Sequence, residues 1–160
     1  MVTFFTALHV VAAIILLGPV VVSTSMFPKQ AAESRNGGEE ATGRASVLHK
    51  VTTTYGMLSV LVPLLGAVVM ASDWGTYKTN YFLHTAIILS VIAWGLLFFL
   101  VIPQQRKMMG TLGALPAADA DPADQTTNFE KSKAKATAGA GIFNLLWMLT
   151  LILMFLPTPA

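Results

Sequence analysis

The sequence has no cysteine, and charged side chains make up only 11% of its 160 residues. Without cysteine, the chain has no disulfide bonds, no thiolate zinc sites and no thiol nucleophiles. A soluble domain usually carries about 25% charged residues, so this composition indicates a chain that largely avoids water. The net charge of +2 is too small to indicate a nucleic-acid partner. We also find no complete catalytic motif, so the sequence does not predict an enzyme.

Charge is missing from four long stretches of the chain. They run roughly over residues 4–27, 51–71, 81–102 and 136–156, and none contains Asp, Glu, Lys or Arg. Each holds about 20 residues, the length that an α-helix needs to cross a hydrocarbon core of about 30 Å. The sequence therefore predicts an all-α fold, a transmembrane four-helix bundle that forms one integral membrane domain over residues 1–160.

Basic residues are distributed unevenly over the three connections between these stretches. Connection 72–80 carries only Lys78, whereas connections 28–50 and 103–135 carry the other nine of the ten lysines and arginines. The positive-inside rule assigns the short connections that are rich in Lys and Arg to the cytoplasm. We therefore expect loops 28–50 and 103–135 to be cytoplasmic and both termini to lie outside.

The two halves of the chain share a short pattern. Leu8-His9 precedes Pro28, Leu83-His84 precedes Pro103, and the His-to-Pro separation is 19 residues both times. Each half then has a cytoplasmic loop, a lysine and a returning stretch. The pattern favours two duplicated helical hairpins related by a two-fold axis along the membrane normal, with each proline ending its helix. The matched residues are few, so chance similarity stays open as the alternative.

His9 and His84 are the candidate ligands for a cofactor. At a rise of 1.5 Å per residue, 19 residues span about 28 Å, which places both histidines at matching depth near the outer boundary. Two imidazoles from parallel helices can bind the iron of haem b. With Met70 or Met154 nearby, they can instead hold copper. The sequence favours the simpler alternative, in which both amphipathic imidazoles anchor their helices at headgroup level, so no firm cofactor or metal is predicted.

Proline and glycine interrupt the first two stretches, at Gly18-Pro19 and at Pro63 and Gly66. Proline removes a backbone hydrogen bond and kinks a helix, and such breaks form ion sites in transporters. Coupled transport tends to need a buried charge, which the four stretches do not offer. We therefore favour packing around a neighbouring helix, and a small transporter remains the third hypothesis.

Small residues gather near the start of the fourth stretch. Small side chains let helices approach closely inside a membrane, either within the bundle or against a partner subunit. Asn144 is the only strongly polar side chain in that stretch, and we expect it to hydrogen-bond to a neighbouring helix. The candidates for packing against a partner are Ala136, Gly139, Ala140, Gly141 and Asn144.

In Leu8-His9, in Gly18 and in its basic first loop, the chain resembles a widespread family of small four-span bacterial integral membrane proteins of unknown function. Its small size and its Ala-, Asp- and Pro-rich segment 114–124, which predicts a flexible or extended linker, are similar to an accessory subunit of the actinobacterial cytochrome bcc–aa3 respiratory supercomplex. This resemblance implies a non-catalytic subunit of a bacterial plasma membrane. Its implied partners are membrane lipids and the subunits of cytochrome bcc and the cytochrome aa3 oxidase.

Overall fold

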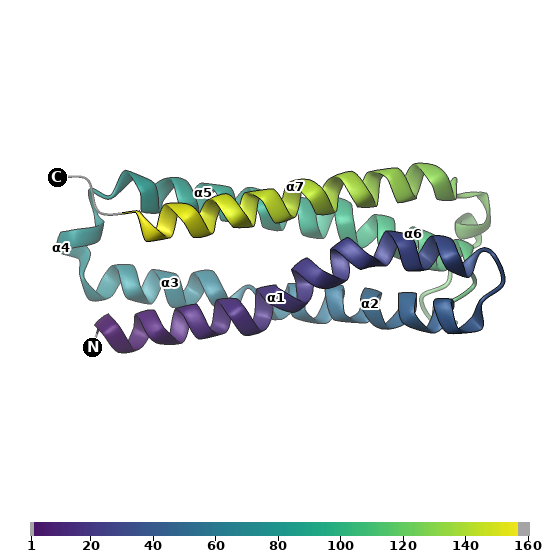
Figure 1. Ribbon diagram of the computed structural model, residues 1–160, viewed down its shortest axis with the longest axis horizontal. Coiled ribbons are helices and arrows are strands. Elements are labelled where there is room, and N and C mark those ends of the chain that lie inside the picture. Colours follow the sequence, from purple (N-terminus) through teal and green to yellow (C-terminus); the bar gives the residue numbers. More distant parts are fainter. Residues whose placement is uncertain (1, 157–160) are drawn as a thin grey trace.

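A computed structural model describes residues 2–156, which form four long helical rods lying side by side (Figure 1). The rods and their connections are, in chain order, α1 (Val2–Ser34), α2 (Glu39–Leu58), α3 (Leu61–Ser72), α4 (Trp74–Tyr77), α5 (Tyr81–Leu96), the π-helix η1 (Leu97–Val101), α6 (Ile102–Thr111), the 3-10 helix η2 (Pro122–Thr126) and α7 (Phe129–Phe155). Each rod is long and apolar enough to cross a membrane. The predicted all-α, multi-pass bundle is therefore confirmed.

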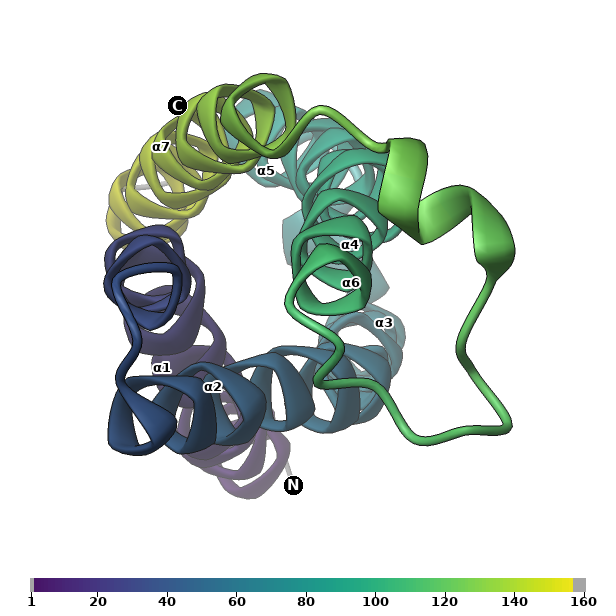
Figure 2. The ribbon, with the colours of Figure 1, turned by 90° about the vertical axis from the view of Figure 1, so that its right-hand side faces the viewer.

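The packing sets the order of the rods around the bundle. α1 packs against α2 and α3 on one side and against α7 on the other, while α5 packs mainly against α7. α6 contacts both α2 and α7. Viewed along the rods, α1 and α5 therefore occupy opposite corners of the bundle (Figure 2).

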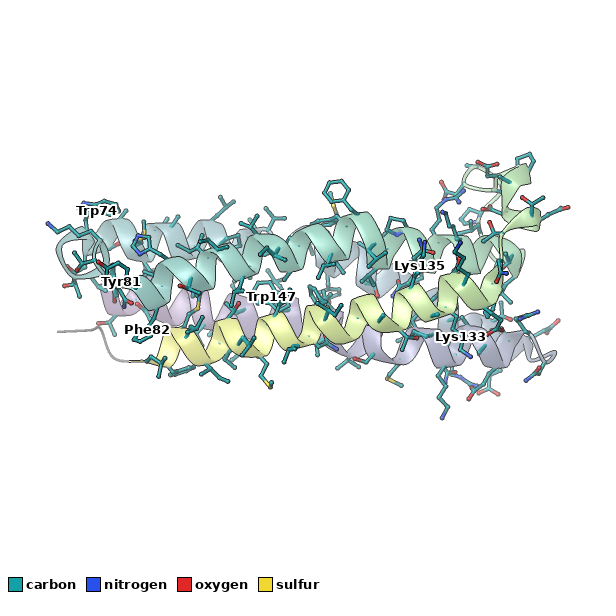
Figure 3. The ribbon with its side chains drawn as sticks, turned by 90° about the horizontal axis from the view of Figure 1, so that it is seen from above. Trp74, Tyr81, Phe82, Lys133, Lys135 and Trp147 are labelled. Atoms are coloured by element: carbon teal, nitrogen blue, oxygen red, sulfur yellow. The ribbon has the colours of Figure 1, made fainter. Side chains whose placement is uncertain are left out.

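The two ends of the bundle differ in chemistry. α4, the start of α1 and the end of α7 lie at one end, which we call the α4 end (Figure 1). The connections 35–38 and 112–128 lie at the other end, the loop end. Trp74 and Tyr81 lie at the α4 end, whereas Lys133 and Lys135 lie toward the loop end (Figure 3). This agrees with two membrane boundaries of different composition, and the side that faces the cytoplasm stays a prediction.

Proline does not end helices in the way that the sequence pattern predicts. α1 continues past Pro28 to Ser34, and α6 continues past Pro103 to Thr111, so that part of the prediction is wrong. A proline ring in a regular helix clashes with the carbonyl group four residues earlier. Before Pro103 the wider turn of η1 provides space for the ring, and beyond Pro28 the fully buried Ala31 holds the last turns of α1 in place.

Pro63 does interrupt its rod, at the junction of α2 and α3. Proline has no N–H with which to bond the carbonyl of Ser59, four residues earlier. The Val62 N–H donates to that carbonyl instead, at 3.0 Å. The rod thus changes from α2 to α3 at Ser59 and Val60 without leaving this carbonyl unpaired.

The buried apolar side chains form two clusters. The loop-end core consists of Phe27, Ala31, Ala45, Met108, Met109, Phe129 and Ala136. The middle core consists of Val20, Ala93, Leu97, Val101 and Phe143. By contrast, α1 has no buried residue before Leu17 in its described part, and α3 buries only Val62. The bundle is therefore packed tightly from the loop end to its middle and loosely at the α4 end.

The long connection 112–128 is held against α6. Arg106 donates from Nη1 to Oδ1 of Asp124 at 3.0 Å and from Nη2 to the carbonyl oxygen of Asp119 at 2.6 Å. Asp124 is buried, and its carboxyl group lies so close to Gly110 that a Cβ there would overlap it. The end of segment 114–124, which was expected to be a flexible or extended linker, instead enters the 3-10 helix η2 and is held by Arg106, a charged partner that composition does not reveal. The connection 35–38 is much shorter, and duplication of the two hairpins stays a prediction.

Candidate functional site

His9 joins two rods near the α4 end. Its Nδ1 atom lies 2.9 Å from the carbonyl oxygen of Val62, so the imidazole donates a hydrogen bond from α1 to α3. The ring lies against Gly66, where a Cβ atom would approach His9 Cε1 to 3.1 Å. Gly66 thus leaves the space that the imidazole fills. Its place in the fold gives His9 a packing role between helices.

His84 makes a local contact at the start of α5. Its Nδ1 atom lies 2.7 Å from the carbonyl oxygen of Asn80, four residues earlier. The buried Asn80 also caps α5, accepting from the Leu83 N–H at 3.2 Å. The His84 side chain therefore stabilises the first turn of its own helix.

The two histidines lie on rods at opposite corners of the bundle. Within residues 2–156, no hydrogen bond or ring contact joins them, and no group of three or more His, Cys, Asp or Glu side chains is placed to hold a metal ion. Met70 is half-buried on α3, and Met154 is exposed on α7. Haem or copper binding by His9 and His84 stays a prediction, and the contacts made by each imidazole fit anchoring.

A hydrogen bond that the sequence did not predict joins α5 to the junction of α2 and α3. The indole Nε1 of Trp94 on α5 donates to Ser59 Oγ at 2.9 Å, and that hydroxyl donates in turn to the Gly56 carbonyl at 2.6 Å. The Trp94 ring packs edge-on against Trp147 of α7, with centroids 5.2 Å apart. The available signal was the position of Ser59, four residues before Pro63. Proline interrupts the regular helix there, and the side chain of Ser59 lies at that interruption.

Two further polar contacts link rods inside the bundle. The hydroxyl oxygens of Ser23 and Thr52 lie 2.8 Å apart, between α1 and α2. His49 Nδ1 lies 3.2 Å from Gln105 Oε1, between α2 and α6. Inside a membrane, an apolar side chain gains little by contacting another helix instead of lipid. Hydrogen bonds between helices therefore help to hold the bundle together. The interior polar groups therefore act as structural links.

The small residues of α7 serve two different surfaces. Ala136 belongs to the loop-end core, and Gly139 is buried against η1, where a Cβ atom would lie 3.0 Å from Val101 and 3.1 Å from Leu100. Ala140 is also buried, whereas Gly141 is exposed with open space around it. Internal packing thus accounts for Ala136 and Gly139, and it leaves Gly141 free for another contact.

Gly141 lies in a groove of about 550 Å³ between α1 and α7, which we call the α1–α7 groove. Its borders include Ser25, Lys29 and Glu33 on α1, and Lys133, Gly141 and Asn144 on α7. The Asn144 side chain donates from Nδ2 to Ser25 Oγ at 2.8 Å. The expected hydrogen bond from Asn144 to a neighbouring helix is therefore confirmed.

The α1–α7 groove brings charged, amide, hydroxyl-bearing and small side chains together on one surface of the bundle. It combines two lysines with small and hydroxyl-bearing side chains, and it opens to the outside of the bundle. Such a surface suits binding of an external group. Comparisons of the chain with protein-family models, with curated proteins and with solved structures found no match.

Proposed function

We propose that the chain is a non-catalytic accessory subunit of a larger integral membrane complex. The observation that carries this proposal is the uneven packing of the bundle. Toward the α4 end, α1 and α3 both expose large apolar side chains, which we call the α1–α3 face. Its residues are Val10, Val11, Ile14, Ile15, Leu61, Leu64 and Val68.

The membrane environment explains why loose packing at one end favours a partner. Lipid tails are as apolar as leucine, so helices associate through close packing and hydrogen bonds between them. At the α4 end the hydrogen bond of His9 to Val62 holds α1 to α3, while Ile14 and Leu64 beside it are 68% and 57% exposed. Transmembrane helices of a partner would supply the close packing that this end lacks.

The identity of the complex is a further part of the proposal. The resemblance to an accessory subunit of the bcc–aa3 supercomplex supports a place beside cytochrome bcc and the cytochrome aa3 oxidase in a bacterial plasma membrane. The absence of charge from the four apolar stretches agrees with a subunit that packs and spaces its neighbours.

The decisive experiment is to extract the tagged protein from its own membranes in mild detergent and to record its native mass and visible spectrum. The accessory role predicts a particle many times the mass of the chain, with haem bands that belong to identified larger subunits. A small colourless particle would contradict the proposal. A small particle with its own Soret band would instead support haem binding by His9 and His84.

Photo-crosslinking tests the proposed docking face directly. A benzophenone side chain at Ile14 or Leu64 should form a discrete product with one subunit of the complex. The matched control is the same group at Ile88, which is 60% exposed on α5. Equal crosslinking from all three positions would show that the partner does not select the α1–α3 face.

A further inference from the structure

The α1–α7 groove straddles the boundary between the charged and uncharged parts of both helices. The uncharged stretch of α1 ends near Phe27, and that of α7 begins near Ala136. The groove is bordered by residues 24–36, on α1 and the turn after it, and by residues 133–144 on α7. One part of it is therefore at headgroup level, and the other part lies beside the hydrocarbon.

Two lysines from different helices border the headgroup part of the groove. Lys29 Nζ lies 3.9 Å from Glu33, and Lys133 Nζ lies 3.9 Å from Glu130, both long contacts between exposed groups. An ammonium group has three donors and a flexible stem, so each lysine keeps donors for a further acceptor.

The two nearby carboxylates are also engaged by arginine. Glu130 accepts from Arg35 at 2.8 Å, and Glu33 lies 3.8 Å from Arg44. Arg44 also donates to Gln30 on α1, which holds it beside Glu33. Arg44 also pairs with Glu40, so the two arginines and two lysines exceed the three glutamates by one positive charge. The mouth of the groove therefore favours an anion.

The hydrocarbon part of the groove has a shallow floor. Ala140 is buried there, and Gly141 beside it has no neighbouring atom within 4 Å of the position of a Cβ. The hydrogen bond from Asn144 to Ser25 closes the floor at its far end. Along α7, the distance from Lys133 to Asn144 is about 16 Å, which is enough for much of an acyl chain.

We propose that the α1–α7 groove binds an anionic phospholipid, with its phosphate between Lys29 and Lys133 and an acyl chain along Gly141 toward Asn144. A phospholipid carries an anionic group and an apolar chain across the same boundary that the groove crosses. Basic pockets between transmembrane helices bind anionic headgroups in this way. A free phosphate would use the lysines but leave the floor by Gly141 without a function. This inference is independent of the proposed accessory role.

Native mass spectrometry of the intact protein tests the proposal, with phosphatidylglycerol and phosphatidylcholine of identical acyl chains as the probes. The wild type should retain phosphatidylglycerol in preference to phosphatidylcholine. The double variant K29Q/K133Q should lose that preference by on the order of tenfold, because two cations near the headgroup are removed. The matched control K50Q/K107Q removes two exposed lysines that do not line the groove, and it should keep the preference.

A second variant addresses the floor without changing charge. Gly141→Leu should fill the groove and reduce retention of phosphatidylglycerol, while Gly18→Leu, at an exposed glycine with open space on α1, should not. Thermal unfolding of each variant checks that the bundle remains folded. Because Gly141 has free space around it, this variant keeps the proposal testable if the lysine variant does not fold.

Four outcomes would overturn the proposal. The first is equal retention of the two lipids by the wild type, and the second is an equal loss of preference in K29Q/K133Q and in K50Q/K107Q. The third is displacement of phosphatidylglycerol by millimolar inorganic phosphate, which would make the groove a site for the free anion. A crosslinker at Gly141 that joins a partner's helix instead of lipid would likewise show that a protein occupies the groove.

Discussion

The Nδ1 atom of His9 lies 2.9 Å from the carbonyl oxygen of Val62, which is 53 residues further along the chain. This contact lies near the α4 end, where the neighbouring side chains of α1 and α3 are largely exposed. The imidazole also fills the space above Gly66. One hydrogen bond between helices therefore holds together the most loosely packed part of the bundle.

Replacing His9 with alanine should destabilise the protein, and His84→Ala should have a smaller effect. Hydrogen bonds between transmembrane helices contribute about 0.6 kcal/mol on average and up to about 1.7 kcal/mol. We expect His9→Ala to lower the free energy of unfolding by about this amount, since it removes both the bond to Val62 and the packing on Gly66. The hydrogen bond of His84 is to Asn80, at the start of its own helix. Unfolding in mixed micelles, followed by circular dichroism, measures both variants.

The same two variants separate anchoring from cofactor binding. If both histidines bound one haem or copper ion, each variant would lose the bound group, and both would lose similar stability. Equal destabilisation together with loss of a Soret band or of stoichiometric copper would contradict the packing role that we assign to His9.

Trp94 and Trp147 form a second matched pair, because only one of the two indoles is hydrogen-bonded. Trp94 Nε1 donates to Ser59 at 2.9 Å, whereas the buried Nε1 of Trp147 has no partner among the described residues. Trp94→Phe should therefore destabilise the bundle by about 0.6–1.7 kcal/mol, the range for a lost hydrogen bond between helices. Trp147→Phe removes an indole N–H that has no bond to lose, so it should cost less. A larger loss in Trp147→Phe would contradict the assigned hydrogen bond.

The sequence was sufficient for the fold class because the relevant signal is simple. Four uncharged stretches of membrane-spanning length predict four helices, and this prediction does not depend on how the helices pack. The ends of those helices were less predictable. Pro28 and Pro103 were predicted to end their helices, but a proline removes only one backbone hydrogen bond. The helix continues past Pro28, where Ala31 is buried in the core, and past Pro103, which follows the π-helix η1. Those factors are tertiary, and no local pattern contains them.

The candidate site was predictable only in part, for the same reason. Asn144 was expected to bond to another helix because an amide inside an apolar stretch needs a partner, and its partner is Ser25. The small residues of α7 looked like one face, but the structure places Gly139 inside and Gly141 outside. Which of these residues faces the interior depends on the order of the rods around the bundle, and we could not predict that order from the sequence. The groove beside Lys29 and Lys133 was missed because its two halves lie far apart in the chain.

The contact between Asp124 and Arg106 predicts how the long connection responds to mutation. Asp124→Ala should expose segment 112–128 to thermolysin, which cleaves before Leu112 or Leu115 when the segment opens. A hydrogen bond to a charged group contributes about 1.5–3 kcal/mol, so the rate of cleavage should rise on the order of tenfold. Asp119→Ala is the control, since Arg106 bonds to the backbone of Asp119 and that variant keeps the bond. Equal cleavage of the two variants would show that Asp124 does not hold the segment.

The orientation in the membrane can be tested cleanly because the chain has no native cysteine. Thr76→Cys in α4 and Ala118→Cys in the long connection both introduce a thiol at an exposed position, one at each end of the bundle. Nine basic residues against one predict that the loop end is cytoplasmic. A membrane-impermeant maleimide should therefore label Thr76→Cys in intact cells and Ala118→Cys only after the membrane is opened. The reverse result would place Lys29 and Lys133 at the outer leaflet, and the lipid proposed for their groove would then have to come from that leaflet.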